Sequence, residues 1–251
     1  MTGLVRKATL LTACGLLAAV TAFAAVPNPA NCTIPCAIVL VGNNVGNTAA
    51  DPYGTFQVVV RDATNSPINN STVTVNFAGC CTDIKLSNTQ LGTGVVHAAN
   101  ASSVTGTTDP TGTVTFIIEG AASQGAGPRT GLVSPNGCAT ITATPNGGGA
   151  ATPLSTTVLV STPDENGAAG TTGVEATDLS VFVADKNAYT LLQANYRQRS
   201  DFDFHLPAFN CSLVFNATFG YGDNLGDLTE WVHVKNSQNS IHNGPFPVTC
   251  P

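Results

Sequence analysis

The run Ser71-Thr-Val-Thr-Val-Asn-Phe77 decides the fold class, because β-branched side chains dominate it and apolar and polar residues alternate along it. Successive side chains of a strand point to opposite faces of a sheet, so this run predicts a strand over residues 72–77. The run Phe56-Gln-Val-Val-Val-Arg-Asp62 precedes it and has the same β-branched character. Between them, Ser66-Pro67-Ile68-Asn69-Asn70 is a turn sequence, since proline presets φ and asparagine accepts a positive φ. The sequence therefore predicts two strands joined by a turn.

Runs of the same kind continue outward from this pair, separated by Gly, Pro, Asn and Asp. Short strands at this density are typical of a β-sandwich. No helical period interrupts them, so we expect antiparallel sheets without parallel crossovers. Residues 120–137 predict a long loop, which Cys138 would anchor. The eight predicted strands are Ala37–Val41, Thr55–Arg61, Thr72–Phe77, Ile84–Leu86, Gly94–Ala98, Thr113–Glu119, Ala139–Thr144 and Thr156–Val160.

Residues 1–24 have the succession of regions that is typical of a cleavable secretory signal peptide. Arg6 and Lys7 precede an uncharged apolar run over 8–23, and small residues flank Phe23. The apolar run is shorter than the roughly 20 residues that a membrane span needs. We therefore expect a secreted or cell-surface protein without a transmembrane segment.

The chain carries few charged residues, and acidic ones predominate. Lys and Arg number 9 against 15 Asp and Glu, and charged residues make up only 10% of the chain. This balance argues against a nucleic-acid partner. At 43% hydrophobic residues, the chain is too apolar to be disordered throughout.

Beyond the predicted leader, the cysteines are odd in number. An exported chain meets an oxidising compartment, so most of them should form disulfides, with one left free or bridging two chains. Their spacing leaves the pairing open and favours structural disulfides over a zinc site. They are Cys32, Cys36, Cys80, Cys81, Cys138, Cys211 and Cys250.

Together with Thr108-Asp-Pro-Thr-Gly-Thr-Val-Thr-Phe-Ile-Ile118, the first two strand runs resemble a bacterial immunoglobulin-like domain of the invasin/intimin type. In that family a strand ending in Asp leads through a Pro turn into a second strand, and a T-D-x-x-G turn opens a later one. The resemblance implies a mainly β chain, with an antiparallel immunoglobulin-like β-sandwich over 25–161. Cys80-Cys81 and the loop after Gly120 depart from the pattern and indicate a variant held by disulfides.

A helix is predicted from Val174 to Asp185, after a linker over 162–173. Thr177 or Asp178 is suited to cap it, and Leu179, Phe182 and Val183 fall on one face.

Carboxylates around this helix have the spacing of calcium ligands, which are oxygen atoms at alternate loop positions. The pattern resembles a dockerin-type, EF-hand-like repeat, which implies a small helical module over 174–222, bound calcium and a cohesin-like partner. Leu206 stands where a second copy would need its turn glycine, so that copy is predicted to have lost calcium. The competing interpretation is a helix cap and a solvated turn. The candidate ligands are Asp164, Asn166, Asp178, Asp201 and Asp203.

The tail over 223–251 contains the single tryptophan, Trp231, in a Trp-Val-His-Val alternation suited to an edge strand or a short helix. On an extracellular protein, an exposed indole ring favours stacking on a sugar. The alternative is a contact with the core or between domains, since tryptophan is usually mostly buried.

No local motif for catalysis is present, and the four histidines are scattered along the chain. We therefore predict a non-enzymatic protein for adhesion or extracellular assembly, with a protein or glycan partner at the cell surface. One alternative is a carbohydrate-binding module centred on Trp231. Another is a disulfide-linked subunit of an extracellular filament, which would be a homo-oligomer.

Overall fold

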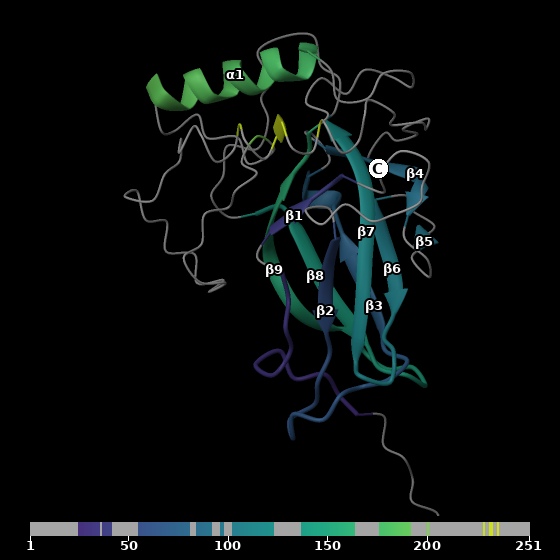
Figure 1. Ribbon diagram of the computed structural model, residues 1–251. Coiled ribbons are helices and arrows are strands. Elements are labelled where there is room, and N and C mark those ends of the chain that lie inside the picture. Colours follow the sequence, from purple (N-terminus) through teal and green to yellow (C-terminus); the bar gives the residue numbers. More distant parts are fainter. Residues whose placement is uncertain are drawn as a thin grey trace, which may run out of the picture.

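The computed structural model describes residues 25–35, 37–41, 55–80, 84–91, 96–97, 102–122, 137–163 and 176–191, together with residues 200, 228, 231, 232 and 235. Over these ranges the chain is mainly β, with nine strands, a 3-10 helix and the α-helix α1 (Figure 1). The strands are β1 (Ala37–Val39), β2 (Thr55–Val59), β3 (Thr72–Asn76), β4 (Ile84–Leu91), β5 (Val96–His97), β6 (Ser103–Thr107), β7 (Thr113–Ala122), β8 (Ala139–Thr144) and β9 (Thr152–Ser161). The helices are η1 (Ala78–Cys80) and α1 (Ala176–Leu191).

A strand is present at each of the eight predicted places, with different ends at most of them. The ninth strand, β6, is absent from the sequence predictions because its Ser-Val-Thr-Gly-Thr run contains a glycine, which disfavours strands. Gly106 is nevertheless required there, because a Cβ at this position would lie 2.7 Å from Cγ2 of Val114. Packing against β7 therefore overrides local propensity in β6.

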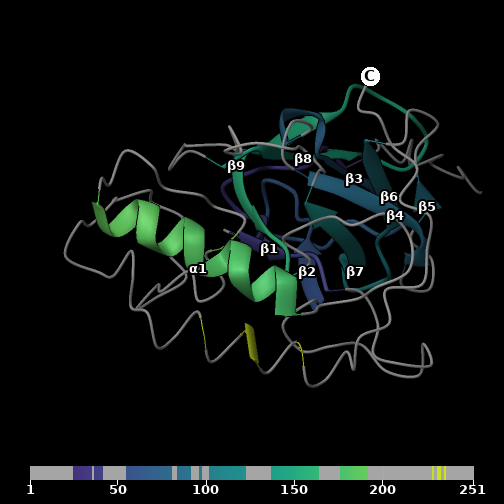
Figure 2. The ribbon, with the colours of Figure 1, turned by 90° about the horizontal axis from the view of Figure 1, so that it is seen from above.

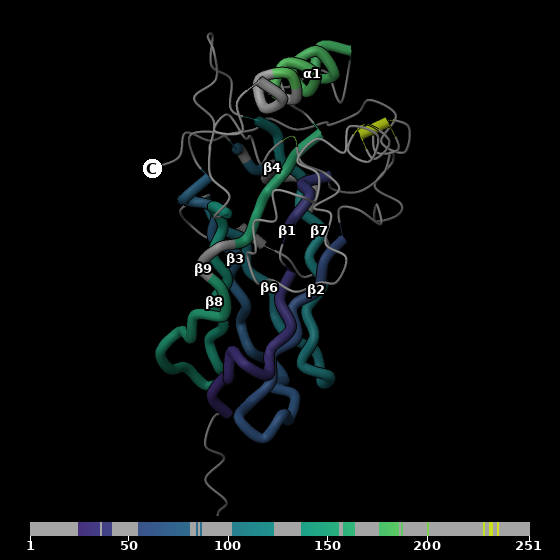
Figure 3. The backbone as a smooth tube through the Cα atoms, turned by 90° about the vertical axis from the view of Figure 1, so that its left-hand side faces the viewer, coloured from purple at the N-terminus to yellow at the C-terminus, as the bar shows by residue number. Residues whose placement is uncertain are grey.

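The strands form a six-stranded sheet in the order β1-β9-β8-β3-β6-β5 and a three-stranded sheet in the order β2-β7-β4. The larger sheet curls around the interior, as the view in Figure 3 shows. The alternation that predicted β3 is confirmed, since Val73 and Val75 are buried while Thr72 is exposed and Thr74 is half-buried.

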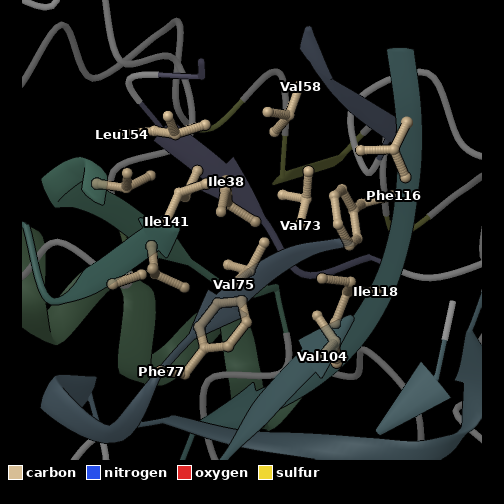
Figure 4. Packing of buried hydrophobic residues seen from close by; sticks show 14 of the residues in the cluster. Ile38, Val58, Val73, Val75, Phe77, Val104, Phe116, Ile118, Ile141 and Leu154 are labelled. Atoms are coloured by element: carbon tan, nitrogen blue, oxygen red, sulfur yellow. The ribbon is translucent and has the colours of Figure 1, made fainter. Parts of the chain in front are cut away.

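Apolar side chains from both sheets meet in one core (Figure 4). Val75 and Ile141 reach it from the larger sheet, and Val58 and Phe116 from the smaller one. The rings of Phe56 and Phe116 stack with their centroids 5.2 Å apart. Each fully buried valine, isoleucine or phenylalanine side chain contributes about 1.5–3 kcal/mol, so this shared core holds the two sheets together.

The expectation of purely antiparallel sheets is wrong for β1, which pairs in parallel with β9, Ala37 lying opposite Leu159. A parallel pair needs a long connection between its strands. Here the strands are the first and the last of the β region, so all the intervening strands form that connection.

The N-terminal segment contacts both sheets. Thr33 exchanges two backbone hydrogen bonds of 2.9 Å with Val59 of the smaller sheet. After β1 has paired with β9, Leu40 donates its N–H to the carbonyl of Ser161 at 2.9 Å. Val41 then forms a bridge with Glu119 of β7. The segment therefore links the two sheets along one side.

A disulfide joins Cys80 and Cys138, with their Cα atoms 5.0 Å apart. Cys80 lies in η1 directly after β3, and Cys138 directly precedes β8, the neighbour of β3. The bond therefore fastens two adjacent strands of one sheet, and it closes a sequence separation of 58 residues. The expectation that Cys80 takes part in a structural disulfide is therefore confirmed, and Cys80 lies buried in the η1 turn between two strands.

Two turns share a D-x-T-x-S/T sequence. In the first, Oδ1 of Asp62 accepts hydrogen bonds from the Thr64 N–H at 2.8 Å, the Thr64 hydroxyl at 2.7 Å and the Ser66 N–H at 2.9 Å. Asn65 completes the turn with φ at 65°. The Thr64 hydroxyl, followed by the Ser66 amide, lowers the pKa of Asp62.

The second turn repeats the first atom for atom. Oδ1 of Asp109 accepts from the Thr111 N–H at 2.8 Å, the Thr111 hydroxyl at 2.6 Å and the Thr113 N–H at 3.0 Å. Gly112 takes the place of Asn65, with φ at 76°. The Thr111 hydroxyl, followed by the Thr113 amide, lowers the pKa of Asp109.

The second turn packs against the chain around the first. A Cβ on Gly112 would lie 2.6 Å from the carbonyl oxygen of Val60 and 3.0 Å from Cβ of Pro67. The Val60 N–H donates to the Gly112 carbonyl at 2.8 Å. Gly112 is therefore required both for its positive φ and for this close approach.

We predict that Gly112→Ala destabilises the fold by about 1–3 kcal/mol, because it adds a backbone clash to the cost of a positive φ. Gly147→Ala is the matched control, since Gly147 has φ at 91° and nothing within 4 Å of the added Cβ. The control should lose only about 1 kcal/mol. Urea unfolding measures the free energy of unfolding of the two variants. Equal losses would show that the close approach of Gly112 to Val60 does not contribute to the cost of the substitution.

We also predict that acid weakens the protein through Asp62 and Asp109. Because their folded-state pKa values are lowered, the stability that they contribute is present above the ordinary aspartate pKa of about 3.9 and is lost as the pH falls through the folded values. The double variant Asp62→Asn/Asp109→Asn should lose less stability between about pH 5 and pH 3 than the parent does. Thermal unfolding at several pH values in that range measures how steeply the stability of each protein falls with pH. The same pH dependence in the parent and the double variant would contradict the prediction.

Candidate functional site

Helix α1 lies across one end of the β structure, on the side of β1 (Figures 1 and 2). Val39 and Val41 pack with Phe182 of α1 and with Trp231, and Leu179 and Leu228 surround them. We call this second apolar cluster the junction. Ile38 and Leu40, which alternate with the two valines, point into the main core. The first strand therefore contacts the core with one face and the helix with the other.

Polar groups are buried around the junction. Trp231 donates its Nε1–H to the carbonyl of Pro163 at 3.3 Å, and Thr162 donates its hydroxyl to the carbonyl of Gly120 at 2.7 Å. Glu119 of β7 and Asp178 of α1 are also fully buried. Trp231 is thus held in the junction by a hydrogen bond as well as by apolar contacts, and a second hydrogen bond ties the end of the β region, at Thr162, to β7.

Of the candidate calcium ligands, the structure places Asp178 alone. It lies buried in the first turn of α1, where a carboxylate interacts favourably with the helix dipole. Because α1 begins at Ala176, Thr177 and Asp178 lie inside the helix and not at its N-cap. Within the described ranges, no group of three His, Cys, Asp or Glu side chains is arranged to hold a metal ion. The other candidates, outside the described residues, are Asp164, Asn166, Asp201 and Asp203.

Cys32 is a free, half-buried thiol. Its Sγ accepts the Arg61 N–H at 3.4 Å and donates to the Arg61 carbonyl at 3.5 Å. Burial raises the pKa of this thiol, which lowers the fraction present as reactive thiolate at neutral pH. Four further cysteines, Cys36, Cys81, Cys211 and Cys250, lie outside the described residues.

Trp231 is in helical backbone and is only 1% exposed, so its ring faces are covered by the junction. A sugar cannot stack on this ring unless α1 and the β structure separate. The indole therefore serves as a contact between segments far apart in the sequence, and any carbohydrate site must be built from other residues.

The outer face of the larger sheet carries an array that the sequence analysis does not identify. Thr72 of β3 lies opposite Thr107 of β6 on one side and Thr144 of β8 on the other. One step along, Thr74 lies between Thr105 and Thr142 in the same way. We call these six residues the threonine lattice. Each strand shows it in sequence as a T-x-T pair, but only the strand register reveals that the pairs are aligned.

No protein-family model matches the chain, and no curated protein matches it. No described helix is long and apolar enough to cross a membrane.

We predict that Trp231→Ala loosens the helix from the β structure, because it removes the largest side chain of the junction. Replacing a buried aromatic residue by alanine typically costs about 3–5 kcal/mol. Val232→Ala is the matched control, since Val232 is adjacent in sequence and 40% exposed. Limited proteolysis after residue 163 should accelerate in the first variant and stay unchanged in the second. Equal cleavage of both variants would show that the junction does not hold the helix.

Proposed function

We propose that this protein acts outside the cytoplasm as a non-enzymatic binding protein for adhesion or extracellular assembly. In this proposal an immunoglobulin-like β-sandwich, residues 25–161, carries the binding surface. A dockerin-like helical module follows it and is attached through the junction.

Strand order is the single observation that carries the proposal. In an immunoglobulin sandwich, strands B, E and D share one sheet and strands C, F and G the other, with extra strands added beyond C in variable-type domains. The order β2-β7-β4 corresponds to B-E-D, and β3-β8-β9 corresponds to C-F-G. The strands β6 and β5 extend the second sheet beyond β3, as the extra strands do. There are two departures from that pattern. The strand β4 precedes both added strands in the chain, and the edge strand β5 precedes β6, which lies next to β3.

The Cys80–Cys138 bond supports a location outside the cytoplasm. Structural disulfides persist in oxidising compartments and are rare in the cytosol. This bond lies within one sheet, whereas antibody domains join their two sheets through strands B and F. It therefore supports the location of the protein independently of the family resemblance.

The proposed helical module has one described helix, α1, docked through Phe182. Next to the buried ring, Val183 is 41% exposed, and Val232 is 40% exposed next to Trp231. These side chains are open to a protein partner of the cohesin type. Calcium would be held by Asp178 with the remaining candidate ligands.

The filament alternative has one supporting observation, the free thiol of Cys32, which would bridge two copies. Because this thiol is half-buried and burial raises its pKa, it forms a disulfide with a second copy only slowly. A monomeric binding protein is therefore the preferred proposal.

The test uses the full chain, expressed with its leader in the host that produces it. We expect a membrane-impermeant label to reach the protein, and peptide mapping without reductant to recover Cys80 bound to Cys138. Beads coated with the mature protein should adhere to the envelopes of the same cells better than beads coated with heat-unfolded protein. A label-protected cytoplasmic protein, or equal adhesion of the two kinds of bead, would overturn the proposal.

A further inference from the structure

Each asparagine side chain is close in sequence to one backbone nitrogen, that of the residue that follows it. If this nitrogen attacks the side-chain Cγ, the asparagine loses ammonia and the chain is permanently modified. The attack needs the nitrogen in a near-attack position, and a hydrogen bond from its N–H opposes that movement. The asparagines therefore differ in susceptibility according to the bonding of the amide that follows each of them.

At most of the described asparagines, the following amide is held in place. The Ser66 N–H, which follows Asn65, donates to Oδ1 of Asp62 at 2.9 Å. Asn28 is followed by a proline, which has no N–H. The amides after four further asparagines donate to a carbonyl or hydroxyl oxygen in the same way, and these asparagines are Asn31, Asn69, Asn70 and Asn76.

Asn146 is different, because the amide that follows it is not held. Asn146 is exposed in the turn between β8 and β9, and the exposed residues Gly147, Gly148 and Gly149 follow it. The Gly148 N–H donates to the carbonyl of Pro145 at 3.3 Å and closes the turn. The Gly147 N–H donates to no atom of the described chain. The nitrogen next to the Asn146 side chain is therefore available for attack.

The surroundings of Gly147 also leave room for the ring that the attack forms. Gly147 has φ at 91° and Gly148 at 88°, and a Cβ built on either residue would meet nothing within 4 Å. Glycine has no Cβ to shield its nitrogen, and it changes backbone conformation at low cost. The turn lies at the end of the β structure away from α1 (Figures 1 and 3). Packing therefore does not oppose the rearrangement of this turn.

We infer that Asn146 is a site of spontaneous modification, where asparagine is converted to aspartate and isoaspartate. Hydroxide removes the proton from the Gly147 nitrogen, which then attacks Cγ of Asn146. The new N–Cγ bond replaces the bond between Cγ and Nδ2, and the nitrogen of the amide leaves as ammonia after taking a proton from water, which restores the hydroxide.

Water then opens the five-membered imide at either of its two carbonyl groups. Breaking the new N–Cγ bond gives aspartate, and breaking the bond between the nitrogen and the main-chain carbonyl carbon gives isoaspartate, in which the backbone runs through Cγ. Both products add a negative charge to a turn that has no charged residue over 145–151. This inference is independent of the proposed function.

The test compares the folded mature protein with the same chain unfolded in guanidinium chloride with reductant, both aged in mildly alkaline buffer. Peptide mapping by mass spectrometry follows the conversion of amide to acid at each asparagine separately. Unfolding removes the hydrogen bonds and keeps the neighbouring residues. The ratio of the two rates at one asparagine therefore separates the effect of the structure from that of the sequence. Asn65 and Asn70 are the internal controls, since the amides after them are hydrogen-bonded.

We expect Asn146 to react in the folded protein within about threefold of its rate in the unfolded chain, and the two controls to react about tenfold or more slowly when folded. Gly147→Ala should slow the reaction at Asn146 in both states, because the added methyl group shields the nitrogen. Protection of Asn146 by folding as strong as that of Asn65 would overturn the inference. An Asn146 that stays intact in both states would overturn it too.

Discussion

Burial of the first strand on both faces is the constraint on which the rest of the structure depends. Ile38 and Leu40 fill the main core, while Val39 and Val41 form the base of the junction. The flanking backbone bonds to Val59 on one sheet and to Ser161 on the other. Without this segment the two sheets would lose their link along one side, and α1 would lose the surface on which it packs. Core, sheet closure and helix docking are therefore coupled through Thr33 and the four residues 38–41.

The same constraint explains why local sequence patterns predict some elements and miss others. Strands with one solvent-facing side, such as β3 and β8, alternate clearly and are found where expected. The run Ala-Ile-Val-Leu-Val over 37–41 does not alternate, and a continuous apolar run is the pattern of a strand buried on both faces, as parallel strands usually are. This run is compatible with the parallel pairing that the sequence analysis excluded, and the partner strand, more than a hundred residues away, could not be predicted from it.

Turn chemistry was predictable and site geometry was not. Asp109-Pro-Thr-Gly indicates a turn from four adjacent residues, because its hydrogen bonds are local. The threonine lattice depends on the register of three strands that are separated in sequence, and the burial of Trp231 depends on α1 and β1. The candidate calcium ligands Asp164, Asn166, Asp201 and Asp203 lie outside the described residues, so calcium binding by these side chains stays a prediction.

The position of the disulfide links stability to the lattice. Cys80 follows β3 and Cys138 precedes β8, and these strands carry two of the three columns of threonines. A slip of one residue in a strand pair would turn every outward side chain toward the core. The covalent bond at one end of the pair opposes such a slip, and the buried valines of β3 oppose it along its length. The alignment of the threonines on β3 and β8 is therefore protected by a covalent bond at one end of the pair and by side-chain burial along it.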